Sequence, residues 1–381
     1  MRAAACLCVL IGLAAGRAVA QNPAPSDQPV TLDQPSGDVQ PVTGEDQHQL
    51  SITGFGVAGY TLDGKTHDNS LGAGKVAVAL FRELTDNLYV FGQLTTSISD
   101  EAEAGEEPTT EIEIDNLLVS FTPRSLSSLN LTFGTLDAPI GFERDDEVLL
   151  LTPTTSFNFE LARPAKLTGL FATCALSRKA DLEGFITNGW DSAVDPNHGK
   201  TVGARLGFLP TERSSLGFST LYGSEGEAGE TNDRLLLDAD YAFQPSRDWL
   251  IAGEANYGKD IDLPDDGGNA SWTGATVLVH RRLDRHWGIA ARAEVLDDKD
   301  GARTGTPQTL TSYVLAPIYS IGVGREGIFA NITHTTYRIP RFQLRGEVRL
   351  NHSDVPFFET SEEDELSRWG VQYTLQLVTT F

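Results

Sequence analysis

The chain has 381 residues, of which 53 are Asp or Glu and 29 are Lys or Arg, so its formal net charge is −24. A nucleic-acid-binding protein usually carries a basic patch that neutralises phosphates, and this chain has none at the scale of a domain. Charged residues make up 22% and hydrophobic residues 40% of the chain, which excludes global disorder. No run of 18 apolar residues follows the N-terminal region, so no transmembrane helix is predicted.

The first 20 residues have the parts of a secretory signal peptide. Arg2 supplies the positive charge, an apolar stretch follows, and Ala18-Val19-Ala20 matches the small-x-small cleavage pattern. Residues 21–48 hold five acidic residues and several prolines but no Lys or Arg, which indicates a disordered, Pro-rich acidic linker. After cleavage Cys174 is the single cysteine left, so an internal disulfide is excluded.

From residue 49 to residue 381, segments of alternating apolar and polar residues are separated by turns. In the last segment Trp369, Tyr373 and Leu375 lie on an apolar face opposite Gln372 and Gln376. The same alternation is clear in four other segments, Lys200–Phe208, Asp248–Gly258, Arg285–Leu296 and Phe342–Asn351. The segments at 51–60, 73–82, 111–121 and 326–338 alternate less cleanly.

Short turns and long connections alternate along this region. The short turns lie at 84–87, 123–128, 178–179, 209–213, 244–247, 283–284 and 339–340. The long connections lie at 61–71, 99–110, 136–167, 188–199, 224–232, 259–269, 297–325 and 353–366. These connections imply an all-β fold of about 16 strands, with 14 or 18 as alternatives. Alternating connection lengths predict a transmembrane antiparallel β-barrel with long outer loops and short periplasmic turns.

Large aromatic residues lie near the ends of the predicted strands, namely Tyr60, Trp249, Tyr257, Trp272, Trp287, Trp369 and Phe381. Membrane barrels carry such residues in girdles at the two membrane interfaces. We therefore predict that these seven side chains form the girdles. The alternative is that they are core aromatics of a soluble β-sandwich.

Three short motifs resemble the OmpL-like β-barrel porin family of bacterial outer-membrane proteins. They are FGTLDAPIGFE at Phe133–Glu143, Asn188-Gly189-Trp190-Asp191, and Asp195-Pro196-Asn197. The segment Phe342–Asp354 also resembles the penultimate strand of that family. The resemblance implies a porin in the outer membrane of a Gram-negative bacterium. Such a porin is a water-filled channel for passive diffusion of small hydrophilic solutes or ions.

In sixteen-stranded porins the third outer loop folds inward and narrows the channel, and the resemblance implies this role for residues 136–167. We hypothesise that acidic residues of this loop face charged residues of the inner wall at a pore constriction. The loop residues are Glu143, Asp145, Asp146 and Glu147, and the wall residues are Arg205, Arg292, Glu294, Arg345, Glu347 and Arg349. Facing charges of opposite sign sort solutes by charge. The alternatives are a ladder of ion pairs that only satisfies buried charges, or a surface helix or strand over 145–151.

Other motifs do not indicate chemistry. Gly54-x-Gly56-x-x-Gly59 has the spacing of a dinucleotide fingerprint but lies in a predicted strand. The histidines form no HExxH pattern, and no G-x-S-x-G sequence is present. We therefore predict no catalytic residue, no metal site, no cofactor and no enzymatic activity. The alternatives are an outer-membrane barrel enzyme, an adhesin, or a soluble secreted carbohydrate-binding protein.

The predicted partners are those of an outer-membrane barrel. The C-terminal strand ending in Phe381 resembles the signal that such proteins present to the barrel-assembly machinery. Acidic residues gather in 99–110 and 353–366, where they either bridge to lipopolysaccharide through divalent cations or form solvated faces. A homotrimer is possible by analogy with other sixteen-stranded porins. Nucleic acid is excluded as a partner.

Overall fold

The computed structural model describes residues 50–99, 109–263, 267–322, 326–328, 336–338, 340–362 and 365–381. The predicted signal peptide (1–20), the predicted linker (21–48) and the acidic stretch 100–108 lie outside the described residues. Within the described ranges, no helix is long and apolar enough to cross a membrane.

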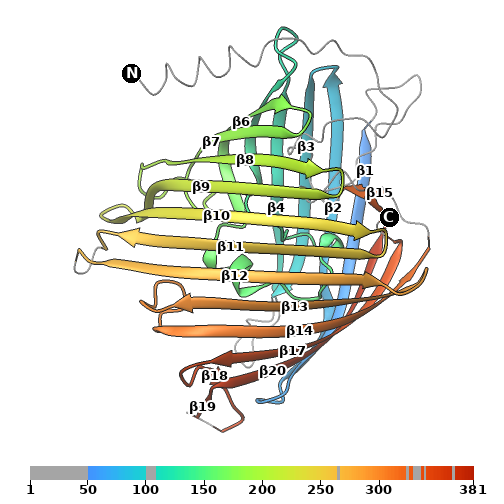
Figure 1. The fold of residues 1–381 in the computed structure, drawn as a ribbon, viewed down its shortest axis with the longest axis vertical. Coiled ribbons are helices and arrows are strands. Elements are labelled where there is room, and N and C mark those ends of the chain that lie inside the picture. Colours follow the sequence, from blue (N-terminus) through green and yellow to red (C-terminus); the bar gives the residue numbers. More distant parts are fainter. Residues whose placement is uncertain are drawn as a thin grey trace.

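Sixteen antiparallel strands of the described chain close into a barrel in sequence order, and the last strand pairs with the first (Figure 1). The strands are β1 (Ser51–Asp63), β2 (Asn69–Thr85), β3 (Leu88–Ser99), β4 (Thr109–Phe121), β5 (Leu129–Asp137), β6 (Lys166–Ser177), β7 (Ala180–Thr187), β8 (Thr201–Thr211), β9 (Ser214–Glu227), β10 (Glu230–Ser246), β11 (Trp249–Ile261), β12 (Asn269–Arg282), β13 (Trp287–Asp298), β14 (Gln308–Ile321), β17 (Phe342–Ser353) and β20 (Trp369–Thr380). The predicted sixteen-stranded antiparallel barrel is confirmed.

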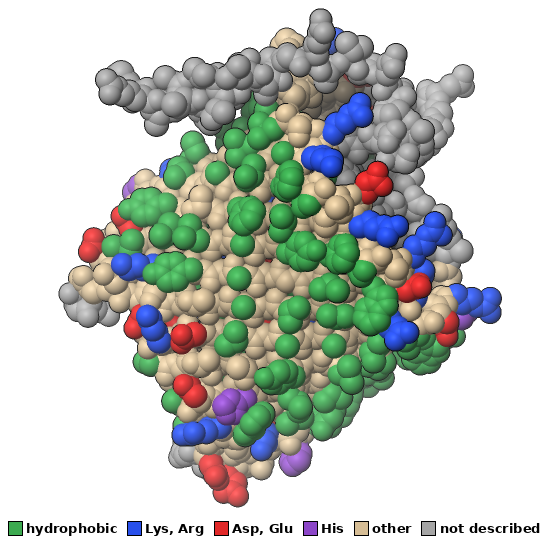
Figure 2. Space-filling view, in the orientation of Figure 1, with side chains coloured by type: hydrophobic (Ala, Val, Ile, Leu, Met, Phe, Trp, Pro, Cys, Tyr) green, Lys and Arg blue, Asp and Glu red, His purple; other side chains and the backbone are tan. Residues whose placement is uncertain are grey.

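The barrel buries polar side chains and exposes apolar ones, as the alternation predicts. On β17, Arg345 and Arg349 are 1% and 4% exposed, whereas Leu344 and Val348 are 39% and 40% exposed. Hydrophobic side chains spread across the middle of the barrel face in Figure 2, and most of the charged side chains lie toward its edges. An apolar outer band of this kind matches lipid, which offers no hydrogen-bond partners.

The predicted aromatic girdle contains one error. Trp249, Trp287 and Trp369 are exposed on the outer surface, as expected, but Trp272 is 1% exposed and belongs to the core. Gly258 of the neighbouring strand makes room for the indole, because a Cβ at Gly258 would lie 2.0 Å from Trp272 Cε2. A glycine within a strand often marks such a close approach.

One predicted strand is in the wrong place, although the predicted number is correct. The predicted loop 297–325 contains β14, which pairs with β13 and β17. The predicted strand 326–338 contributes only β15 (Glu326–Ile328) and β16 (Thr336–Arg338), a separate hairpin in the connection between β14 and β17. The sequence hides β14 because both of its faces are apolar over Tyr313–Ile318, so apolar and polar residues do not alternate there.

The connection lengths therefore do not alternate strictly. Residues 322–341 form a long connection at the end of the barrel where the other connections are short turns. Conversely, β9 and β10 join through only residues 228–229, where a loop over 224–232 was predicted. Gly229 has φ +95°, which permits so tight a turn.

Candidate functional site: an inward loop and its anchors

Residues 138–165, between β5 and β6, fold into the barrel, and we call them the inward loop. They contain two short helical turns, η1 (Glu147–Leu149) and η2 (Asn158–Ala162), which lie behind β10–β12 in Figure 1. Val148 and Leu149 pack on Phe55 and Val378 of β1 and β20. Residues 145–151 are therefore neither a surface helix nor a barrel strand; they pack on the inner wall.

Two carboxylates on adjacent strands hold the part of the inward loop that follows β5, which we call its first limb. One of them also binds Arg163, near the other end of the loop. The amide of Gly141 donates to Asp238 Oδ1 at 3.2 Å, and that of Phe142 donates to Glu254 Oε2 at 3.1 Å. Arg163 Nε donates to Glu254 Oε1 at 2.8 Å. Gly141 has φ +66°, and a Cβ there would lie 2.0 Å from Glu254 Oε2. Only glycine fits, which gives a physical reason for the glycine in the APIGFE part of the family motif.

On one side, which we call the arginine side, the loop meets buried charges of β13 and β17. Glu143 Oε1 lies 3.2 Å from Arg292 Nη1, and Arg349 Nη2 lies 3.6 Å from Glu294 Oε1. These four side chains are at most 5% exposed. The arginine side comprises Glu143, Arg292, Glu294, Arg345, Glu347 and Arg349. Three of its residues are acidic and three basic, so its formal charge is zero.

The guanidinium groups of the arginine side also bind the backbone of the loop. Arg345 Nη1 donates to Glu147 O at 2.6 Å, Arg292 Nη2 to Thr155 O at 2.7 Å, and Arg349 Nη1 to the same oxygen at 3.1 Å. Glu347 Oε1 accepts from Thr154 Oγ1 at 2.6 Å. These bonds seat the loop against the wall.

Arg205 lies apart from the predicted constriction acids. Its Nη1 and Nη2 donate to the two carboxylate oxygens of Asp240 at 2.6 and 3.0 Å. Both side chains are almost fully buried. Of the facing pairs that the sequence predicts, the structure brings Glu143 and Arg292 into direct contact.

On the other side, which we call the lysine side, the loop meets β2–β6. Lys166 Nζ lies 2.6 Å from Asp115, 2.5 Å from Asp137 and 3.6 Å from Asp145. The lysine side comprises Lys75, Asp115, Asp137, Asp145, Asp146, Glu147 and Lys166. Five carboxylates against two lysines leave a formal charge of −3.

The lysine side is partly solvated. The side chain of Asp145 is 36% exposed and that of Lys166 is 18% exposed. Asp146 is buried, accepts a hydrogen bond from Gln93 Nε2 at 2.7 Å, and has its pKa raised to about 7 by burial and by the charge of Asp137. Lys75, Asp115, Asp137 and Lys166 were not among the predicted constriction residues. Asp115 lies at a β-bulge that interrupts the alternation, so no parity rule identifies it.

A cluster of four side chains lies beside the part of the inward loop that precedes β6, residues 156–165, which we call its second limb. The cluster consists of Trp190, Arg234, Trp272 and Arg303, and we call it the aromatic clamp. The rings of Trp190 and Trp272 meet edge to face with centroids 6.0 Å apart. Arg303 Cζ lies 5.2 and 5.0 Å from the two ring centroids, and Arg234 Cζ lies 4.7 and 5.8 Å from them. Trp190 belongs to the second family motif, and the clamp explains its position.

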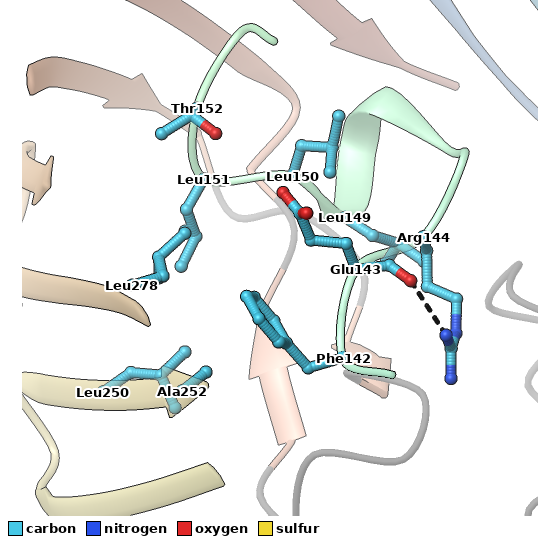
Figure 3. Close-up of a pocket in the computed structure, with 10 residues that line it drawn as sticks. All are labelled: Phe142, Glu143, Arg144, Leu149, Leu150, Leu151, Thr152, Leu250, Ala252 and Leu278. Carbon is cyan, nitrogen blue, oxygen red and sulfur yellow. Dashed lines mark hydrogen bonds between the residues drawn. The ribbon is translucent and has the colours of Figure 1, made fainter. Parts of the chain in front are cut away.

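The cavity in Figure 3 lies between the inward loop and the wall formed by β11 and β12. It has a volume of about 20 Å³ and is lined mainly by Phe142, Leu149–Leu151, Leu250 and Leu278. That volume holds about one water molecule. It is therefore a packing void between apolar side chains of the loop and of the wall. In the described part of the chain, no group of three or more His, Cys, Asp or Glu residues is placed to hold a metal ion.

The profile of the family described as "putative beta-barrel porin-2, OmpL-like" matches residues 86–381. The chain belongs to this family. The predicted family and the predicted location in a Gram-negative outer membrane are thereby confirmed. The alternative of a soluble secreted protein receives no support.

Solved outer-membrane proteins share the fold at low sequence identity. OmpT of Vibrio cholerae is 9% identical, with a TM-score of 0.59 over 90% of this chain and 100% of that chain. The outer-membrane channel DcaP of Acinetobacter baumannii is 12% identical, with a TM-score of 0.62 over 87% and 97%. The anion-selective porin from Comamonas acidovorans is 10% identical, with a TM-score of 0.60 over 87% and 99%. No curated protein gives a significant match to the chain.

Proposed function

We propose that this porin is a water-filled channel through which small hydrophilic solutes or ions diffuse passively. The observation that carries the proposal is the polar interior of a closed barrel with a loop seated inside it. Several inward residues of β13 and β17 are charged, and two of them, Arg292 and Glu347, contact Glu143 and Thr154 of the inward loop. An inner face of this polarity suits a water-filled lumen rather than a dry core. The relative DcaP is described as a channel, which supports the same function.

The inward loop sets the constriction in this proposal, with different roles for its two sides. The residues Glu143, Arg292, Glu294, Arg345, Glu347 and Arg349 hold the loop, because they are buried and either form ion pairs or bond to it. Asp145, Asp146 and Glu147 act on passing solutes together with Lys75, Asp115, Asp137 and Lys166. Water reaches the lysine side, where the formal charge is −3. Carboxylates beside a narrow aqueous path attract cations and repel anions. The channel therefore prefers cations.

The remaining parts of the proposal concern processing and partners. Residues 1–20 are removed as a signal peptide, and residues 21–48 are a linker to the barrel. The channel works without a cofactor and without enzymatic activity. The recorded trimer form of OmpT from Vibrio cholerae supports a homotrimer. Lipopolysaccharide and outer-membrane lipids surround the barrel, and the assembly machinery reads the strand that ends in Phe381.

The test is to add purified, detergent-folded protein to a planar lipid bilayer. We expect discrete conductance steps, and in a KCl gradient we expect a reversal potential with the sign of a cation-preferring channel. Heat-denatured protein is the control and should give no steps. If folded protein gives no steps, the channel function is wrong. If it gives steps with an anion-preferring potential, the proposed role of the lysine side is wrong. Liposome swelling with neutral and charged sugars then defines the solute class.

A further inference from the structure

The aromatic clamp brings together two connections and two strands that are far apart in sequence. Trp190 lies in the connection between β7 and β8, and Arg303 lies in that between β13 and β14. Trp272 and Arg234 lie on β12 and β10. Trp190 and Trp272 are 8% and 1% exposed, so the contacts are desolvated. Cation–π contacts are strongest when the groups are shielded from water.

Two members of the clamp bind the last turn of η2 directly. Trp272 Nε1 donates to Ala162 O at 3.0 Å, and Arg303 Nε donates to Leu161 O. These are carbonyls at the C-terminal end of a helical turn, where no helical amide follows to satisfy them. The clamp thus holds the point at which the inward loop leaves the lumen.

The other residues around the clamp keep its members in place. Arg234 Nε and Nη2 donate to the two carboxylate oxygens of Asp260 at 2.6 and 3.0 Å. The Trp190 amide donates to Glu225 Oε2 at 3.1 Å. Asp191 Oδ1 accepts from the amides of Ala165 and Lys166 at 2.8 and 2.7 Å, which ties the same connection to the end of the inward loop.

From this geometry we infer that Trp190, Arg234, Trp272 and Arg303 are positioning residues of the channel, which latch the second limb of the inward loop and so keep the constriction at a fixed width. The inference rests on the proposed function. The arginine side fixes the middle of the loop, and the two carboxylates Asp238 and Glu254 fix its first limb. The clamp adds Trp272 and Arg303 to the contacts of η2, beside the Asn158–Thr276 hydrogen bond of 2.7 Å and the buried Arg163–Glu254 ion pair. When it opens, the second limb moves and the current through the pore fluctuates.

The test compares Arg303→Met and Trp190→Ala with wild type in planar bilayers and by amide hydrogen exchange. We expect both variants to show added current noise and a shifted mean conductance. Amides of residues 156–165 should exchange about tenfold faster, because their local opening no longer breaks the clamp. Trp190→Phe should restore quiet currents, because it keeps an aromatic ring beside the guanidinium groups.

Arg281→Met is the matched control. Arg281 Cζ lies 5.0 Å from the Trp249 ring on the outer surface, so this variant loses an exposed cation–π contact without touching the loop. Its currents and exchange rates should equal those of wild type. Unchanged noise and unchanged exchange in both clamp variants would overturn the inference, as would equal changes in Arg281→Met. Hydrogen exchange reports on the latch even if wild type does not conduct, so a failed latch is distinguishable from a failed channel function.

Discussion

The two sides of the inward loop both combine carboxylates with cations, but they differ in the balance of charge and in exposure to water. On the arginine side three acids meet three arginines, and the side chains of the Glu143, Arg292, Glu294 and Arg349 network are at most 5% exposed. On the lysine side five carboxylates surround two lysines, and Asp145 is 36% exposed. Buried charge must be balanced because desolvation of an unpaired ion is costly, whereas solvated charge need not be. Excess charge therefore marks the wet side.

The choice of cation fits this difference. Arginine presents several donors in a rigid plane, so one guanidinium can bind a carboxylate and two loop carbonyls together, as Arg292 does. Lysine is a compact, strongly hydrated charge on a flexible stem. Lys166 sits among three carboxylates in a partly solvated cluster. The first arrangement immobilises the loop, and the second presents charge to water.

The largest effect should come from Arg292→Met, which tests whether the arginine side is structural. The change leaves Glu143 buried without its arginine and leaves Glu294 with Arg349 at 3.6 Å. Breaking a buried pair in this way costs about 3–5 kcal/mol. We expect a clearly lower unfolding temperature in detergent, followed by the heat-dependent shift of the barrel on gels. The ion preference of the surviving channels should stay close to that of wild type.

Arg282→Met serves as the comparison for that variant. Arg282 pairs with Asp248, and these side chains are 50% and 56% exposed. An exposed pair contributes about 0–1 kcal/mol, so this variant should unfold almost as wild type does. A large change of ion preference in Arg292→Met without loss of stability would remove the distinction between the two sides.

A smaller effect is expected from Asp145→Asn, which changes the lysine side alone. The formal charge there falls from −3 to −2. A unit charge about 10 Å from an ion in water contributes roughly 0.4 kcal/mol, or about a twofold change in ion preference. The reversal potential in a KCl gradient measures it. Glu227→Gln, which removes a charge at the turn between β9 and β10, should change it less. Equal shifts in the two variants would show that only total charge matters.

The smallest effect concerns pH. Burial and the charge of Asp137 raise the pKa of Asp146 to about 7. Above that pH Asp146 is ionised and adds to the negative charge of the lysine side, whereas below it the group is neutral. Cation preference should therefore weaken as the pH falls from about 8.5 to about 5.5. Asp146→Asn should flatten this part of the pH profile, and a profile unchanged by the substitution would exclude Asp146 as its source.

Alternation was enough to predict β13 and β17 and the inward direction of Arg292, Arg345 and Arg349. It failed for β14, where the inward residues Val314, Ala316 and Ile318 are as apolar as their outward neighbours. It also failed for Trp272, whose inward direction depends on the space over Gly258. Only part of the lysine side was predicted from the sequence. Asp115 lies at a bulge, and Lys75 belongs to this side only because its Nζ lies 3.4 Å from the Glu147 carboxylate. Such pairings depend on the path of a loop, which strand patterns do not encode.

The seating of the inward loop also has a consequence for assembly. The seam of the barrel is the pairing of β1 with β20, the contact of greatest sequence separation among its strands. Val148 and Leu149 pack against Phe55 and Val378, one from each strand of that seam. Contacts so distant in sequence form slowly, because the intervening chain must first be ordered. The loop therefore offers an apolar surface on which the first and last strands can pack together. This packing lowers the free energy of the closed barrel.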